Sequence, residues 1–232
     1  MNHRRLLDLF YEFSAHIEAL HTLYLDSLVG YSILHERLLA HQDSIRQILG
    51  DHEYATQEFQ DTCSIIYKHL ANRDYTPVSM SPVMKQGDMK LRVVDDGLNT
   101  RLLGRQCVVS AYAYWDEYLR IEIGKALGLL PASVLASKKK TQKILNEHVI
   151  SDFWGDMRVI RNSIVHANGV ANSDIIKCKI LTRFKPGDHI ELSRDYMHKI
   201  FLQMEDYRNQ LHKMSLPEHS IRIPTPRRDD RG

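Results

Sequence analysis

Three neighbouring residues in the C-terminal half of the chain have side chains suited to chemistry on a phosphate. Arg161 and Asn162 are adjacent, and His166 follows four residues after Asn162. Histidine transfers protons near neutral pH. Arginine carries a permanent charge on a fork that fits phosphate oxygens. Cleavage of RNA by its own 2′-hydroxyl needs a base, an acid and a cation, and these side chains could supply them without a metal ion.

These residues belong to a stretch, residues 151–169, that reads as one amphipathic helix. Ser151 is a good N-cap, and Asn168-Gly169 is a C-terminal stop pair. One face should be buried, with Phe153, Met157, Ile160 and Ile164 at helical spacing. The opposite face is expected to make a second contact, with a partner or an anionic ligand, through Trp154, Arg158, Arg161, Asn162, Val165 and His166.

Residues 161–166, Arg-Asn-Ser-Ile-Val-His, resemble the Arg-Asn-x3-His form of the Arg-x4–6-His motif of the HEPN superfamily. The resemblance extends over roughly residues 100–214. It implies an all-helical protein and a metal-independent endoribonuclease that leaves a 2′,3′-cyclic phosphate and a 5′-OH, as a toxin or phage-defence effector. It also implies Arg161, His166 and Asn162 as catalytic residues. A two-fold homodimer would bring both motifs into one cleft.

The motif itself is short. A chain with 18 arginines and 13 histidines contains about one Arg-x4-His by chance. Arg46/His52 and Arg183/His189 satisfy the looser spacing as well. Context favours Arg161/His166, because an Asn follows the Arg and the predicted helix ends just after the His. The alternative is an ordinary surface Arg and His at a helix end.

Geometry on a regular helix raises a difficulty for this site. Arg161 and His166 are five residues apart, so they diverge by about 140°, whereas Asn162 and His166 share a face. We therefore expect Arg161 and His166 to converge only if the helix loosens near its end or a second copy contributes. His166 in the last turn should favour its protonated form, since it lies at the negative end of the helix dipole.

Charged residues elsewhere could support the site. Asp116 and Glu117 lie on a predicted helix over residues 98–128 and could orient Arg161 or His166, although an ordinary solvated face is the better explanation. Possible RNA contacts are Arg158 and the run Lys138, Lys139 and Lys140, which precedes the motif helix. Most such runs are simply solvated.

The pattern along the chain predicts an all-α protein: a long N-terminal helical hairpin plus a helical bundle with a small β-hairpin insertion. The resemblance implies that this bundle is HEPN-like. Residues 1–75 should form the hairpin, with its joint at residues 40–43. Residues 76–97 read as a linker, with a short strand at 89–94. The helical domain should span 98–215, with the β-hairpin at 176–192, before a flexible tail at 216–232.

Composition limits the partners. A net charge of +2 gives no general attraction to nucleic acid, so RNA binding needs a local patch. No apolar run approaches a membrane span, and no signal peptide is evident, so a cytoplasmic protein is expected. No spacing predicts a metal site or a cofactor. The expected partners are RNA, a second copy and possible antitoxin or other defence-system proteins. The competing hypotheses are a non-catalytic HEPN-like module that binds RNA or protein, and a purely structural helical scaffold.

Overall fold

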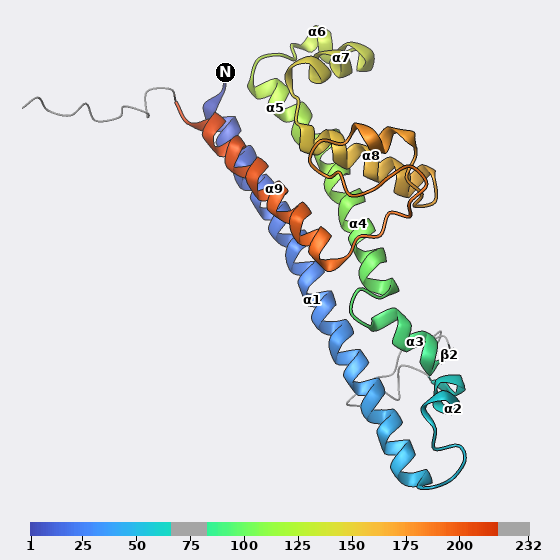
Figure 1. Ribbon diagram of the computed structural model, residues 1–232. Coiled ribbons are helices and arrows are strands. Elements are labelled where there is room, and N and C mark those ends of the chain that lie inside the picture. Colours follow the sequence, from blue (N-terminus) through green and yellow to red (C-terminus); the bar gives the residue numbers. More distant parts are fainter. Residues whose placement is uncertain (66–82, 218–232) are drawn as a thin grey trace, which may run out of the picture.

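The computed structural model describes residues 1–65 and 83–217, which form an all-α protein (Figure 1). A π-helical turn, Trp115–Leu119, joins two of the helices. No helix in this described part is both long enough and apolar enough to cross a membrane. The helices are α1 His3–Leu49, α2 Gln57–Thr62, α3 Gln86–Val93, α4 Leu98–Tyr114, α5 Arg120–Ala126, α6 Ala132–Leu135, α7 Lys138–His148, α8 Asp152–His166 and α9 Arg194–Ser215, and the strands are β1 Ser64–Ile65 and β2 Met84–Lys85.

Aromatic side chains from four helices form the centre of the main core. Trp115, at the end of α4, stacks on Trp154 of α8 with ring centroids 5.0 Å apart and an interplanar angle of 8°. Tyr207 of α9 meets both indoles edge-on, and Phe13 of α1 packs against Trp154 and Tyr207. Such offset and edge-on pairs suit the charge distribution of aromatic rings. The core therefore fixes α8 against α1, α4 and α9.

The predicted N-terminal hairpin is wrong. Helix α1 runs unbroken through residues 40–43 and ends at Gly50, whose φ is 55°. The 40–43 stretch contains no Gly or Pro, so nothing in it stops a helix. Gln42 is buried there, and its amide donates to Asp61 and accepts from Gln57. The second helix of the expected hairpin is replaced by the short α2, and its end beyond residue 65 lies outside the described residues.

The segment expected to be a linker contains ordered structure where it is described. Residues 89–94, predicted as a strand, belong mostly to α3. Met89 of α3 packs with Leu38 of α1 and Ile65 of β1 in a second, smaller core. The main core contains side chains from α1 as well as from α4, α8 and α9, so it crosses the boundary drawn between residues 75 and 98. Most of the tail, 218–232, lies outside the described part.

The predicted β-hairpin at residues 176–192 is also wrong. A 3-10 turn, Ser173–Lys177, is followed by irregular chain, with a single bridge between Val170 and His189. The buried positions recur every third residue rather than every second: Ile175, Cys178, Leu181 and Phe184. The backbone N–H groups at residues 179–181 donate to the carboxylate of Asp156 instead of to a neighbouring strand.

A histidine on the seam between α1 and α4 makes stability depend on pH. The ring of His16 stacks on Tyr114 at 3.9 Å, and its Nε2 is buried without a hydrogen-bond partner in the described structure. Desolvation by burial lowers the pKa of His16. As the pH drops below about 6.5, this histidine takes up a proton in the unfolded chain before it does so in the folded chain. The free energy of unfolding therefore falls as the pH drops below about 6.5. Urea unfolding at several pH values between 5 and 8 measures how the free energy of unfolding changes with pH. This change should be smaller for His16→Phe than for the parent protein, and it should stay the same for His52→Gln, which alters an exposed residue.

Candidate functional site

Helix α8 has the predicted start and stop. The Ser151 hydroxyl accepts a hydrogen bond from the Trp154 N–H at 3.5 Å. At the other end, the Ser163 carbonyl accepts from the N–H groups of Ala167 and Gly169. Asn168 and Gly169 have φ values of 51° and 78°, in the left-handed region that ends helices. His166 is therefore held in the final turn, next to a sharp change of direction.

The three candidate catalytic side chains meet at this end of the helix. Arg161 Nη1 donates to Asn162 Oδ1 at 3.0 Å and lies 3.1 Å from His166 Nε2. His166 is exposed, and Arg161 and Asn162 are half-buried. The helix remains regular through His166. Convergence thus occurs within one chain, because the long Arg161 side chain spans the angle that separates the two positions.

The contact between Arg161 and His166 suits one form of the imidazole. Arginine has only donors, so the contact is a hydrogen bond when Nε2 is the unprotonated nitrogen of the ring. A neutral ring with an unprotonated Nε2 is the form needed by a general base.

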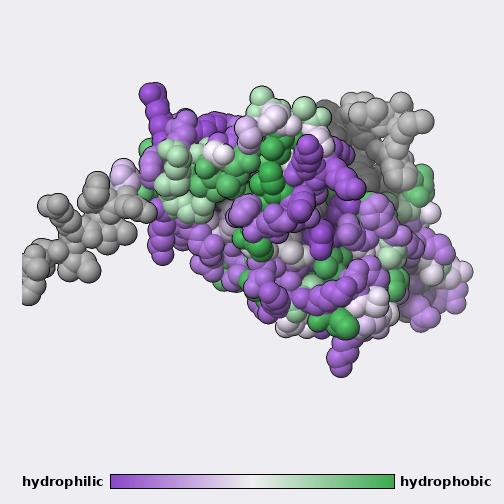
Figure 2. All heavy atoms as spheres, turned by 90° about the horizontal axis from the view of Figure 1, so that it is seen from above, coloured by the Kyte–Doolittle hydropathy of each residue, from purple (hydrophilic) through white to green (hydrophobic). Residues whose placement is uncertain are grey.

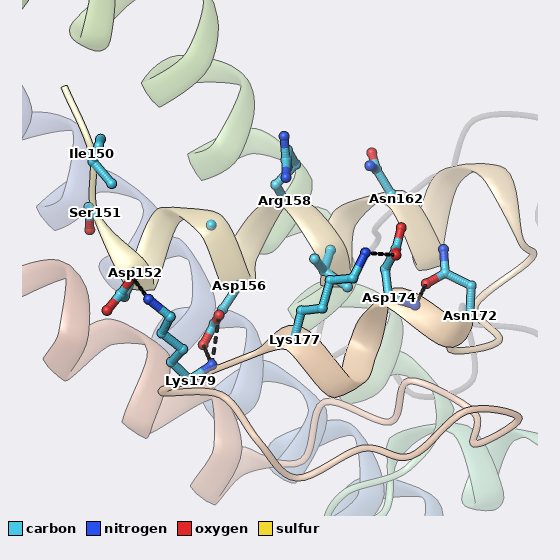
Figure 3. A pocket seen from close by; sticks show the side chains of 12 residues that line it. Ile150, Ser151, Asp152, Asp156, Arg158, Asn162, Asn172, Asp174, Lys177 and Lys179 are labelled. Atoms are coloured by element: carbon cyan, nitrogen blue, oxygen red, sulfur yellow. Dashed lines mark hydrogen bonds and ion pairs between the residues drawn. The ribbon is translucent and has the colours of Figure 1, made fainter. Parts of the chain in front are cut away.

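Three cavities follow one another along α8, and Arg158 lines all of them. We call them the Gly155 cavity (about 470 Å³), the indole cavity (about 320 Å³, beside Trp115 and Trp154) and the Tyr112 cavity (about 220 Å³). Figure 3 shows the first, with Arg158 and Asn162 projecting from the same side of α8. Arg158 is exposed and has no hydrogen bond or ion pair within the described residues. It is a free cation one helical turn from Arg161.

Asp116 and Glu117 lie on the π-helical turn and line the Tyr112 cavity with Arg158, Arg161 and Asn162. Asp116 is paired with Arg120, at 3.3 Å. Neither carboxylate bonds Arg161 or His166 in the described structure. They face the site without orienting it by direct contact. Single π turns inside helices frequently occur at functional sites.

The charged side chains around the Tyr112 cavity affect the pKa of Tyr112. Burial raises the pKa of Tyr112, and the nearby Asp116 raises it further. The positive charges of Arg158, Arg120 and Arg161 act in the opposite direction. Cations and carboxylates therefore act together on the small volume beside Tyr112.

The lysine run takes a separate position. Ser137 caps α7, and Lys138, Lys139 and Lys140 are all exposed on its first turn. They line a shallow hollow along α7 and none of the three cavities beside α8. Asn146 of α7 lines both this hollow and the indole cavity. The structure thus does not bring the lysines to the candidate site.

The sequence predicts Trp154 on the face of α8 that contacts a partner or a ligand, but Trp154 is only 2% exposed in the single chain, so that part of the prediction is wrong. Stacking on Trp115 draws it into the core. Val165, at 46% exposure, remains on the outer face. Seen from above, the surface is mostly hydrophilic, with hydrophobic side chains in smaller patches (Figure 2). The outer face of α8 is therefore narrower and more polar than the sequence suggested.

Sequence reasoning missed Asp156, which shapes one wall of the Gly155 cavity. Its carboxylate is 3% exposed and accepts from the backbone N–H groups of Lys179, Ile180 and Leu181 at 2.6–3.0 Å. Burial, and next the negative charge of Asp156, raise the pKa of Cys178 to about 12. The only signal in the sequence is an Asp directly before the buried Met157. Its partners follow more than 20 residues later, so spacing could not reveal them.

Comparison of the chain with protein-family models, with curated proteins and with solved structures finds no match. Within residues 1–65 and 83–217, no three His, Cys, Asp or Glu side chains are grouped so that they could hold a metal ion. The chemistry of the site therefore has to be argued from its own residues.

Proposed function

We propose that this protein is a metal-independent endoribonuclease whose active site is Arg161, Asn162 and His166. One observation carries the proposal: Arg161 joins Asn162 at 3.0 Å and His166 at 3.1 Å on an accessible helix end. The residues match the HEPN-like motif, and the free cation Arg158 lies beside them. A substrate with several phosphates would meet two arginines in succession.

Each residue has a role in the cleavage. His166 Nε2 takes the proton from the 2′-hydroxyl as the 2′-oxygen attacks the adjacent phosphorus. The bond from phosphorus to the 5′-oxygen breaks, and an acid returns a proton to that oxygen. The products are a 2′,3′-cyclic phosphate and a 5′-OH end. Arg161 turns from the imidazole to the phosphate oxygens, where it stabilises the added charge, and Asn162 positions Arg161.

Among the described residues, no second imidazole contacts Arg161, so the general acid has to come from elsewhere. We propose a two-fold homodimer across the C-terminal end of α8, so that the partner's imidazole protonates the leaving oxygen. Val165, next to His166 and 46% exposed, is the apolar residue available for this contact.

Light scattering at micromolar concentration should show a dimer, and Val165→Glu should weaken it, since a carboxylate would be desolvated at the contact. The matched control is Ile48→Glu, which changes an aliphatic residue 84% exposed at the far end of α1 and should leave the dimer intact. A monomer at all micromolar concentrations, with cleavage retained, would contradict the dimer.

The enzyme proposal is tested by incubating the purified full chain with RNA in EDTA and analysing the product ends. We expect cleavage with 2′,3′-cyclic phosphate and 5′-OH termini. Cleavage only after addition of a divalent metal would reject the assignment.

We further propose that the ribonuclease acts as a toxin or phage-defence effector, controlled by an antitoxin or another defence protein. Expression should arrest bacterial growth, and His166→Ala should relieve the arrest. Arrest by the His166→Ala variant would separate toxicity from this site.

A second candidate is a non-catalytic RNA-binding module. The contact between Arg161 and His166 also favours this module, because a ring nitrogen that is bonded to Arg161 is not available to take a proton from RNA. Arg158 can bind a phosphate without any reaction taking place. RNA binding without cleavage, weakened equally by Arg158→Ala and Arg161→Ala, would support this reading.

A further inference from the structure

The Gly155 cavity has an unusual floor. Gly155 lies inside α8, and a Cβ built on it would meet no heavy atom within 4 Å. Glycine is the least favourable residue inside a helix apart from proline. The packing of this chain therefore gives no reason for glycine here. Its absent side chain leaves the helix backbone open to whatever enters the cavity.

Two asparagine side chains line this cavity, and in the described structure each has a side-chain amide nitrogen without a hydrogen-bond partner. Asn162 Oδ1 accepts from Arg161, and Asn172 Oδ1 accepts from the Asp174 N–H at 2.9 Å. Both oxygens are therefore committed, and each amide nitrogen has no partner among the described residues. The two nitrogens are donors available to a ligand (Figure 3).

The charges around the cavity are mostly paired. Lys177 is bound to Asp174 at 2.6 Å, and Lys179 to Asp152 at 2.7 Å (Figure 3). Arg158 alone among these cations is unpaired in the described structure. Apolar contact comes from Ile150, which is 69% exposed, and from Val159. The cavity thus offers two aliphatic side chains, the open backbone at Gly155, two amide donors and one cation, Arg158, whose charge also acts on the nearby Asp174.

We propose that the Gly155 cavity binds a nucleobase of the RNA next to the scissile phosphate, with its carbonyl edge toward Asn162 and Asn172. This inference rests on the proposed function. A volume of about 470 Å³ falls within the usual range of small-ligand pockets. Asn162 contacts Arg161 and also lines the cavity, so the nucleotide bound there must neighbour the reacting one. Arg158 takes the phosphate between them.

The donors predict which bases fit. Uracil, cytosine and guanine each carry a carbonyl oxygen, whose two lone pairs can accept from both amide nitrogens, whereas each ring nitrogen of adenine accepts one hydrogen bond. The site should therefore discriminate against adenine at this position. A second copy of the chain is the other conceivable occupant. A floor bordered by two ion pairs and two amides suits a nucleotide better than a packed helix.

The experiment compares two glycine substitutions. Gly155→Leu places a side chain in the cavity, and Gly30→Leu is its matched control, because Gly30 also lies inside a helix with open space at its Cβ position. Neither substitution should lower the melting temperature. Binding of fluorescent 2′-O-methyl oligonucleotides, which cannot be cleaved, is measured by anisotropy with uridine-rich and adenosine-rich sequences.

We expect the parent protein and Gly30→Leu to bind the uridine-rich oligonucleotide about tenfold more tightly, the effect of roughly one hydrogen bond. Gly155→Leu should bring this ratio close to one. Sequencing of product ends from random RNA should show the same loss of preference.

A second variant replaces one of the two hydrogen-bond donors of the cavity with an acceptor. Asn172→Asp keeps an oxygen for the Asp174 N–H and replaces the free donor with an acceptor. The preference should shift toward adenine, whose amino group donates. An unchanged base ratio in both Gly155→Leu and Asn172→Asp would overturn the proposal. So would a Gly155→Leu variant that changes the oligomeric state alone, which would indicate a second copy as the occupant.

These outcomes are separate from those of the ribonuclease proposal. Cleavage in EDTA with a base ratio insensitive to Gly155→Leu would overturn only the nucleobase site. Selective binding without any cleavage would uphold the nucleobase site and reject the enzyme.

Discussion

Replacing His166 with alanine should lower the rate of RNA cleavage in EDTA by about 100- to 10,000-fold, the usual contribution of a positioned acid or base. His166 Nε2 lies 3.1 Å from Arg161 Nη1, and no other histidine makes a described contact with Arg161. Single-turnover rates on a defined oligonucleotide measure the loss. Normal cleavage by His166→Ala would reject the proposed mechanism.

Substitutions of Arg161 and Asn162 should lower the rate of RNA cleavage by no more than the substitution of His166 does. Arg161→Ala should cost about 100- to 1000-fold. Arg161→Lys should recover only part of this, because it keeps the charge and loses the fork. Asn162→Ala should be milder, since Asn162 positions Arg161 and transfers no proton. Arg46→Ala and His52→Ala form the matched control, as this pair has similar spacing at the far end of α1.

Replacing Asp156 with alanine should lower the free energy of unfolding by roughly 3 kcal/mol or more, because it strips partners from three backbone N–H groups, each costing about 1–3 kcal/mol if left unsatisfied. The carboxylate is 3% exposed and accepts from Lys179, Ile180 and Leu181. Urea denaturation followed by circular dichroism measures the change.

The contrasting variants sharpen this test. Asp156→Asn should restore most of the loss, because Asp156 Oδ2 alone accepts from all three N–H groups and an amide oxygen in its place can do the same, while the amide nitrogen would replace Oδ1 beside the Lys179 N–H. Asp152→Ala, one turn earlier on α8, removes a partly exposed partner of Lys179 and should change stability only slightly. Equal effects for Asp156→Ala and Asp152→Ala would show that the loop does not depend on the buried carboxylate.

Local chemistry in the sequence determined where several described helices begin. Ser137, Ser151 and Ser193 each accept a backbone N–H at the start of α7, α8 and α9, and the Ser151 cap is the one that the sequence analysis predicts. Asn168 and Gly169 end α8. These interactions span three or four residues, so a linear pattern contains all the information needed to predict them.

Tertiary contacts explain the three places where the sequence pattern predicted the wrong structure. The period-two pattern after Ile175 predicted strands, but the distant Asp156 captures the N–H groups that a sheet would need. Trp154 lies on the expected outer face of α8 in a helical projection, yet stacking on Trp115 buries it. The break in the apolar seam at residues 40–43 predicted a reversal, whereas α1 continues to Leu49 because α2 and α3 pack beside its far half.

The candidate site combines both kinds of information. Residue types in the sequence identified Arg161, Asn162 and His166, since few side chains can move protons and neutralise a phosphate. The sequence could not show that they meet, because an ideal helix separates Arg161 and His166 by about 140°. The side-chain conformation of Arg161, with Nη1 between Asn162 and His166, closes that gap. Only the folded chain adds the row of cavities around the unpaired Arg158, which residues from α4, α7, α8 and the 172–179 loop build together.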